Sequence, residues 1–141
     1  MTSSSKHASQ IGIDVLKNGG NAIDAAIAVG FALSVTFPNA GNLGGGGFMV
    51  IRTSSGEVKT IDFREVAPQN ASRDMYLDEN GDVISGMSLY TAHASGVPGT
   101  VAGFEYAHER FGTKSWNYLL RPSIQLATNG FELSFRDAMY L

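Results

Sequence analysis

The sequence contains no cysteine, and only 16% of its 141 residues are charged. Without cysteine the chain has no disulfide, no thiolate nucleophile and no cysteine-based metal site. Ten Lys and Arg against 13 Asp and Glu give 10 − 13 = −3, which excludes a nucleic-acid binder driven by a basic surface. No run of about 18 apolar residues occurs, so no membrane-spanning helix is expected, and residues 1–7 lack the apolar stretch of a signal peptide.

Histidine is also scarce: His7, His93 and His108 are the only imidazoles, and no two lie within five residues of each other. The close helical pair typical of zinc sites, as in H-E-x-x-H, is therefore missing. We expect neither a metal nor an organic cofactor. His108 lies on the apolar face of an expected helix, which indicates a hydrogen-bonded core residue. His7 is interpreted as a surface residue at a helix start.

Glycine is abundant, with 17 residues, or about 12% of the chain against a usual value near 7%. Four of them stand together from Gly44 to Gly47. A phosphate-binding loop leads from a strand through glycines into a helix, whereas these glycines lead from a helix and turn into a strand. The run therefore indicates backbone crowded against a neighbouring layer or loop, where no Cβ is tolerated.

Two helices are expected before the glycine run. Ser5 is a suitable N-cap for the first, and Gly19-Gly20 ends it. The second begins after Asn21, and Asp24 stands at its third position, where a short acid interacts with free N–H groups and the helix dipole. Asp24 is the only charge from residue 22 to 35. A helix so apolar on nearly all sides should lie between layers of a larger structure.

A hairpin is expected after the glycines. Residues 48–52 predict a buried strand, residues 54–57 a turn, and residues 58–65 a second strand that alternates in polarity. The short glycine-containing turn favours antiparallel pairing. Residues 69–97 have a weak pattern and are assigned to surface excursions and short helical turns, with a clear turn at 78–82.

Two further helices are expected in the last third of the chain. Residues 98–100 open one that ends at Gly112, with a shared face formed by Val101, Phe104, His108 and Phe111. The other runs from about 115 to 128 and is interrupted or entered near Pro122. The apolar, uncapped end at 136–141 suggests a piece of something longer.

The usual signatures of a hydrolase are absent or unspecific. No Gly-x-Ser-x-Gly elbow occurs. Residues 91–95, Thr-Ala-His-Ala-Ser, place hydroxyls beside an imidazole, but residues two apart on a strand or loop share a face by chance very often. Asn70-Ala71-Ser72 matches a glycosylation acceptor, a pattern too common to decide anything. We assign no catalytic residue to this chain.

Arg64 is the candidate binding residue. It lies at the end of the alternating strand, on the face opposite Ile61 and Phe63. A guanidinium can clamp a substrate carboxylate with two parallel hydrogen bonds, which lysine cannot do. The structural alternative is a pairing with Asp62, two residues away on the same face, and the residues alone favour it.

Several separated segments, in order and over roughly residues 7–137, resemble the large subunit of bacterial-type gamma-glutamyltranspeptidases. They are residues 19–26, 38–49, 61–68 and 96–104, and residues 122–131 resemble that family's next helix.

The resemblance implies an α+β fold, the N-terminal-nucleophile hydrolase fold, in which two sheets lie between helical layers in a four-layer αββα sandwich. It implies a precursor that cuts itself into large and small subunits. Residues 1–141 would form the N-terminal portion of the large subunit, a single and incomplete domain. A place within these layers would explain why residues 22–35 are apolar on nearly all sides. Relatives of this type are exported, so a periplasmic or secreted location is expected.

The resemblance also implies the reaction. The N-terminal threonine of the small subunit attacks a γ-glutamyl amide such as glutathione, with its own α-amine as base. A γ-glutamyl ester forms, and water or an amine then takes the acyl group. In the D-x-R-E-x-A-P segment, Arg64 would hold the α-carboxylate of the donor. The nucleophile lies beyond this chain, so the chain alone should be inactive. Residues 91–95 resemble the Thr-x-His-x-Ser sequence around the family's nucleophile only superficially.

Two alternatives stay open. A related acylase or polyglutamate-processing enzyme could share the scaffold, because the leaving-group side of the pocket lies outside this chain. The chain could also be a non-catalytic binding or structural module that kept half of the fold.

Overall fold

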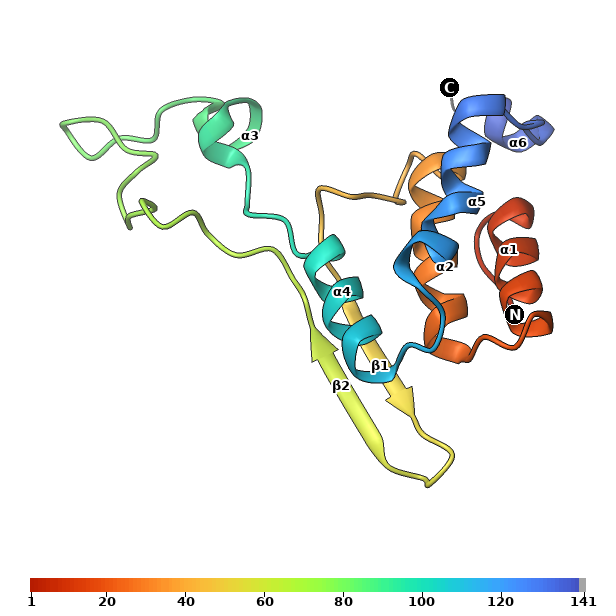
Figure 1. The fold of residues 1–141 in the computed structure, drawn as a ribbon. Coiled ribbons are helices and arrows are strands. Elements are labelled where there is room, and N and C mark those ends of the chain that lie inside the picture. The colour runs from red at the N-terminus through yellow and green to blue at the C-terminus, as the bar shows by residue number, and fades with distance from the viewer. Residues whose placement is uncertain (140–141) are drawn as a thin grey trace. The chain divides into compact units, whose positions relative to one another are not determined.

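The computed structural model describes residues 1–139 and combines helices with one β-hairpin, in agreement with the expected α+β class (Figure 1). In chain order the elements are α1 (Lys6–Lys17), α2 (Ala22–Thr36), β1 (Phe48–Arg52), β2 (Val58–Asp62), α3 (Met87–Tyr90), a 3-10 turn η1 (Ala92–Ala94), α4 (Thr100–Phe111), α5 (Trp116–Asn129) and α6 (Phe135–Ala138).

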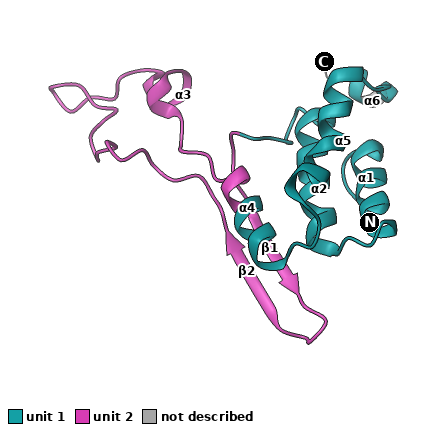
Figure 2. Ribbon diagram, viewed as in Figure 1, with its two compact units in different colours: residues 1–43, 104–141 teal, residues 44–103 magenta. Residues whose placement is uncertain are grey.

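The chain divides into two compact units (Figure 2). Unit 1 contains residues 1–43 and the chain from 104 onward, and unit 2 contains residues 44–103. The boundary falls within α4. That residues 1–141 are one incomplete domain of a larger subunit stays a prediction.

In unit 1, α1 and α2 are capped as the sequence predicts. The Ser5 hydroxyl accepts the N–H of Ala8 at the start of α1. The Asn21 side chain accepts the N–H groups of Ile23 and Asp24, and the Asp24 carboxylate accepts the N–H of Asn21, so a capping box begins α2. A left-handed glycine, Gly19, follows α1.

The prediction that α2 is covered on nearly all sides is confirmed, because Ala22 is its only exposed residue. Helices α1 and α5 both pack against it. Small residues allow the close approach: a Cβ on Gly12 of α1 would lie 2.7 Å from the Val29 side chain of α2. Phe31 of α2 meets the rings of Phe104 and Trp116 edge to face, at centroid distances of 5.2 and 5.4 Å.

Asp24 is the fully buried carboxylate of unit 1, with 0% of its surface exposed. Besides the N–H of Asn21, it accepts the N–H and the hydroxyl of Thr113 at 2.9 and 2.5 Å and the N–H of Lys114 at 3.2 Å. Burial raises the pKa of Asp24, but these hydrogen bonds outweigh it and hold the pKa below its ordinary value. The carboxylate therefore ties the start of α2 to the chain between α4 and α5.

Helices α4 and α5 have the expected bounds within one or two residues, but one face differs. Val101 is 41% exposed, and the covered face of α4 is formed by Thr100, Gly103, Phe104 and Ala107. The expected face wrongly included Val101, because apolar spacing alone does not show that glycine and alanine sit at the closest contacts. Helix α5 runs through Pro122 without a break.

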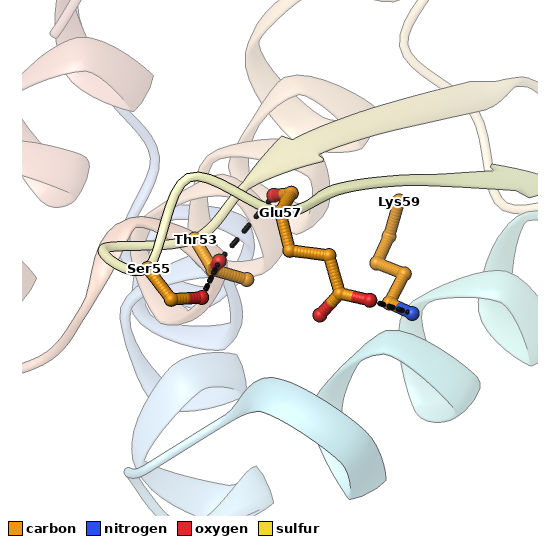
Figure 3. Close-up of polar contacts among 4 residues, drawn as sticks. All are labelled: Thr53, Ser55, Glu57 and Lys59. Carbon is orange, nitrogen blue, oxygen red and sulfur yellow. Dashed lines mark hydrogen bonds and ion pairs between the residues drawn. The ribbon is translucent and has the colours of Figure 1, made fainter.

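In unit 2, β1 and β2 form the predicted antiparallel hairpin, with Phe48 opposite Asp62 and Arg52 opposite Val58. The connecting turn is held by the Thr53 hydroxyl, which lies 2.8 Å from the Ser55 hydroxyl and donates to the Glu57 carbonyl at 3.3 Å (Figure 3). Glu57 and Lys59 form an ion pair beside it.

The expectation that residues 48–52 form a buried strand is wrong. Ile51 is buried, but Phe48 and Val50 on the other face are 67% and 73% exposed. A continuous apolar run predicts burial on both faces, and within the described residues only one face of this two-stranded sheet is covered. Residues 69–97 form the expected surface excursion, with a turn at 78–82, α3 and η1. Across residues 1–139 the structure contains no helix with the length and apolarity that a membrane crossing needs.

The Asp24 network gives the first prediction. Replacing Asp24 by Asn places an amide against several N–H donors, so the free energy of unfolding should fall by about 3 kcal/mol. The exposed carboxylate Asp14 of α1 is the matched control, and Asp14→Asn should change stability by less than about 0.5 kcal/mol. Urea unfolding of the purified variants measures both effects.

The pH dependence follows from the lowered pKa of Asp24. A carboxylate whose folded-state pKa is lowered contributes stability above its unfolded pKa of about 3.9, and this contribution is lost as pH falls through the folded pKa. The stability gap between wild type and Asp24→Asn should therefore narrow in acid, below about pH 4. A gap that stays constant on acidification would contradict the assignment.

Candidate functional site

Arg64 lies just beyond the end of β2 in unit 2, where the hairpin passes into the excursion of residues 69–97. The expected alternation is confirmed: Ile61 is buried and Phe63 half-buried, whereas Asp62 and Arg64 are exposed. The regular strand ends at Asp62 rather than at Glu65. Arg64 is thus presented by a short extended segment at the end of the hairpin.

The backbone around Arg64 is held on both sides of the residue. Phe63 and Gly47 exchange two backbone hydrogen bonds, at 3.0 and 3.3 Å, which continue the β1–β2 ladder by one pair. Val66 and Val97 exchange two more, at 2.8 and 3.3 Å. Between these pairs, the N–H of Arg64 donates to Oδ1 of Asp62 at 3.0 Å. Residues 63, 64 and 66 are therefore each held by a backbone hydrogen bond.

Glycines from two loops enclose this segment. A Cβ on Gly46 would lie 2.5 Å from the Phe63 carbonyl oxygen and 2.8 Å from Cα of Arg64. A Cβ on Gly99 would lie 3.0 Å from the Arg64 carbonyl oxygen and still closer to that of Phe63. On Gly96 it would lie 3.1 Å from Cβ of Glu65. The prediction that the glycine run admits crowded backbone is confirmed at Gly46.

The guanidinium of Arg64 has two neighbours. Its Nε lies 3.0 Å from Oε2 of Glu65, and its Cζ lies 5.9 Å from the centre of the Phe48 ring. The side chain remains 61% exposed. The alternative pairing of the Arg64 side chain with Asp62 is wrong. The Asp62 carboxylate accepts the main-chain N–H of Arg64, and the Glu65 carboxylate pairs with the guanidinium.

This arrangement can bind an anion. Glu65 pairs with Nε of Arg64. Within residues 1–139 the two terminal amino groups of Arg64 contact no other acid. Two parallel N–H groups on an exposed guanidinium suit a carboxylate. Sequence reasoning missed Glu65 and Phe48 as neighbours of the guanidinium. The position of Glu65 next to Arg64 was the available signal, whereas the Phe48 contact depends on the hairpin register.

The remaining candidates lie apart from one another. His108 is the hydrogen-bonded residue expected, with Nε2 2.6 Å from the Lys114 carbonyl oxygen. His7 lies in the first turn of α1, as expected, but it is half-buried rather than a surface residue, with Nε2 3.0 Å from the Glu132 carbonyl oxygen. Thr91 donates its hydroxyl to the Met87 carbonyl, and His93 is exposed. No hydroxyl–imidazole pair therefore forms at residues 91–95.

Two hollows of the structure are not lined by Arg64. These hollows, of about 420 and 620 Å³, are lined by residues of unit 1. One is bordered by α1 and α5, and the other by the start of α1 and the chain after α5. Among residues 1–139 no three His, Asp or Glu side chains gather as metal ligands would.

Comparison with known proteins shows consistent matches. A family model described as gamma-glutamyltranspeptidase matches residues 8–141. The chain is 56% identical over 124 residues to the glutathione hydrolase proenzyme of Escherichia coli K12, covering 88% of this chain and 21% of that protein. It thus spans about a fifth of the length of the curated relatives it matches.

Two solved structures agree with this result. The gamma-glutamyltranspeptidase of Helicobacter pylori matches with a TM-score of 0.93 and 51% identity, over 99% of this chain and 40% of that one. The enzyme of Pseudomonas nitroreducens complexed with L-DON matches with a TM-score of 0.91 and 45% identity, over 99% and 42%. The predicted α+β fold of the N-terminal-nucleophile hydrolase type is confirmed. Within the described residues the chain holds one two-stranded sheet, so it forms only part of that fold.

The glycine contacts give the second prediction. Gly46→Ala forces a methyl group into the Phe63–Arg64 backbone and should lower the free energy of unfolding by about 1–3 kcal/mol. Gly44 is the matched control from the same run, because a Cβ there would meet nothing within 4 Å. Urea unfolding should show Gly44→Ala close to wild type, and equal losses in the two variants would refute a steric role for Gly46.

Proposed function

The chain belongs to the gamma-glutamyltranspeptidase family, and we propose that, within a longer precursor, it supplies the residue that binds the α-carboxylate of a γ-glutamyl donor. The observation that carries the proposal is the geometry of Arg64. Its guanidinium is exposed, its backbone is fixed, and its Nε is already paired with Glu65. The terminal amino groups remain for a carboxylate, which arginine binds in bidentate fashion.

The reaction we propose is γ-glutamyl transfer or hydrolysis on glutathione and other γ-glutamyl amides. A threonine hydroxyl attacks the amide carbon and gives its proton to the α-amine of the same threonine. The amine half of the donor leaves with a proton, and a γ-glutamyl ester remains. Water or an acceptor amine then attacks the ester and restores the hydroxyl. The names of the relatives as glutathione hydrolase proenzymes support this reaction.

No catalytic residue of this chain takes part in the proposed reaction. The threonine would come from a small subunit cleaved from the same precursor, so that the two polypeptides form a heterodimer. The description of the relatives as proenzymes supports a precursor. We further propose a periplasmic or secreted location, with which the absence of cysteine is compatible.

The third prediction concerns Arg64 in the full-length protein. Arg64→Lys loses one of two parallel hydrogen bonds and should weaken donor binding by about 1.5–3 kcal/mol, as expected for a charge-assisted contact, and Arg64→Ala loses both bonds. The KM for a γ-glutamyl anilide should therefore rise roughly ten- to hundredfold in Arg64→Lys and by more in Arg64→Ala. Arg52 is the matched control, an exposed arginine on the same hairpin, and Arg52→Ala should leave KM unchanged.

Three donors identify the group that Arg64 binds. A 4-aminobutanoyl anilide lacks the α-carboxylate, and Arg64→Ala should not weaken its binding further. A glutaryl anilide keeps the carboxylate but lacks the α-amino group, so a γ-glutamyl enzyme should use it poorly, whereas an acylase of the same scaffold should use it well. An equal loss for all three donors in Arg64→Ala would contradict a carboxylate contact.

A further inference from the structure

We infer that Asp62 is a positioning residue for Arg64 and that it acts through the main chain of Arg64 rather than through its charge. This inference rests on the proposed function, since it concerns how the binding residue is held. Its starting point is the hydrogen bond from the Arg64 N–H to Oδ1 of Asp62, 3.0 Å long.

The hairpin register explains why Arg64 needs this bond. In an antiparallel pair, the backbone groups of successive residues point alternately toward and away from the partner strand. Phe63 exchanges both of its hydrogen bonds with Gly47 of the β1 side. The N–H of Arg64 therefore points away from β1, toward the outer edge of β2. On that edge the next backbone pairing in the described residues is at Val66 with Val97.

Asp62 supplies the acceptor that a further strand would otherwise provide. A carboxylate two residues before an N–H can close a local Asx turn, which sets the backbone direction at the intervening residue. Asp62 is exposed, and its own place in the ladder is opposite Phe48, the ring that lies beneath the guanidinium. Without the bond, Arg64 could rotate about its backbone between the pairs at 63 and 66.

Rotation of the Arg64 backbone would disturb the two contacts of its side chain. The guanidinium meets Glu65 through Nε and Phe48 through its face. Phe48 is held in the β1–β2 ladder, so a small change in the backbone direction at Arg64 moves the long side chain away from its ring. The same change alters the direction of Arg64 relative to the neighbouring Glu65. The terminal amino groups would then no longer be held in one orientation for a substrate carboxylate, and affinity should fall.

A role of Asp62 through its charge predicts a different effect of mutation on KM. Its negative charge near the site would repel a substrate carboxylate, so removal of the charge alone should leave KM equal or lower. Loss of the backbone acceptor should instead raise KM. Variants that separate charge from hydrogen bonding therefore decide between the two roles.

The fourth prediction uses three neutral variants of the full-length protein. Asp62→Asn keeps a carbonyl acceptor, and Asp62→Thr keeps a hydroxyl that makes the same turn more weakly. Asp62→Val has nearly the shape of threonine, suits a strand and has no acceptor. The KM for a γ-glutamyl anilide should rise about fivefold in Asp62→Val and stay near wild type in Asp62→Asn, with Asp62→Thr between them. The kcat should stay within about twofold.

A merely structural role would affect all donors. The KM increase in Asp62→Val should disappear with the 4-aminobutanoyl anilide, which lacks the α-carboxylate. Equal behaviour of Asp62→Val and Asp62→Asn would overturn the inference. A valine variant that fails to fold while the threonine variant folds would also overturn it, because the bond would then support the hairpin itself.

Arg64→Ala, measured in parallel, separates the inference from the proposed function. If Arg64→Ala raises KM but Asp62→Val does not, only the role of Asp62 is wrong. If Arg64→Ala leaves KM unchanged, the proposed carboxylate contact fails, and the inference fails with it.

Discussion

The candidate site depends on one steric constraint, the close approach of the Phe63–Glu65 backbone to Gly46, Gly96 and Gly99. A side chain at Gly46 or Gly99 would overlap main-chain atoms, which cannot move aside as a flexible side chain can. This packing brings the end of the hairpin against the chain that returns from the excursion. Arg64 and Glu65 are the charged residues of this enclosed segment, so the backbone packing decides where the guanidinium and its carboxylate partner lie.

Both units use an aspartate to satisfy backbone N–H groups at a break in regular structure. Asp24 is fully buried and accepts N–H groups of Asn21, Thr113 and Lys114, so that it joins the start of α2 to a distant loop. Asp62 is exposed and serves one N–H at the end of β2. The difference in burial explains the difference in role: the first carboxylate stabilises the unit, and the second orients one residue.

Much of the local structure could be predicted from the residues. The caps at Ser5 and Asn21, the end of α1 before Gly19 and the hairpin between residues 48 and 62 all follow from signals within a few positions of one another. The wrong predictions concern the burial of side chains, which contacts between distant residues decide. The exposed face of β1 and the exposure of Val101 depend on what packs against them, which no local pattern contains. The resemblance to a family supplied the expected role of Arg64, which the residues alone did not favour.

The sequence by itself determined the helices, the hairpin and the candidate arginine, because hydrophobic periodicity, capping and turn chemistry act between near neighbours along the chain. Only the tertiary structure decided that Glu65 rather than Asp62 pairs with the guanidinium, that Phe48 lies beneath it, and that Gly46 and Gly99 enclose its backbone. The Phe48 contact arises from the strand register, and the enclosure arises from the loops around Gly46 and Gly99, which are 53 residues apart in the chain. Their geometry depends on how the folded segments meet, and residue order alone does not specify it.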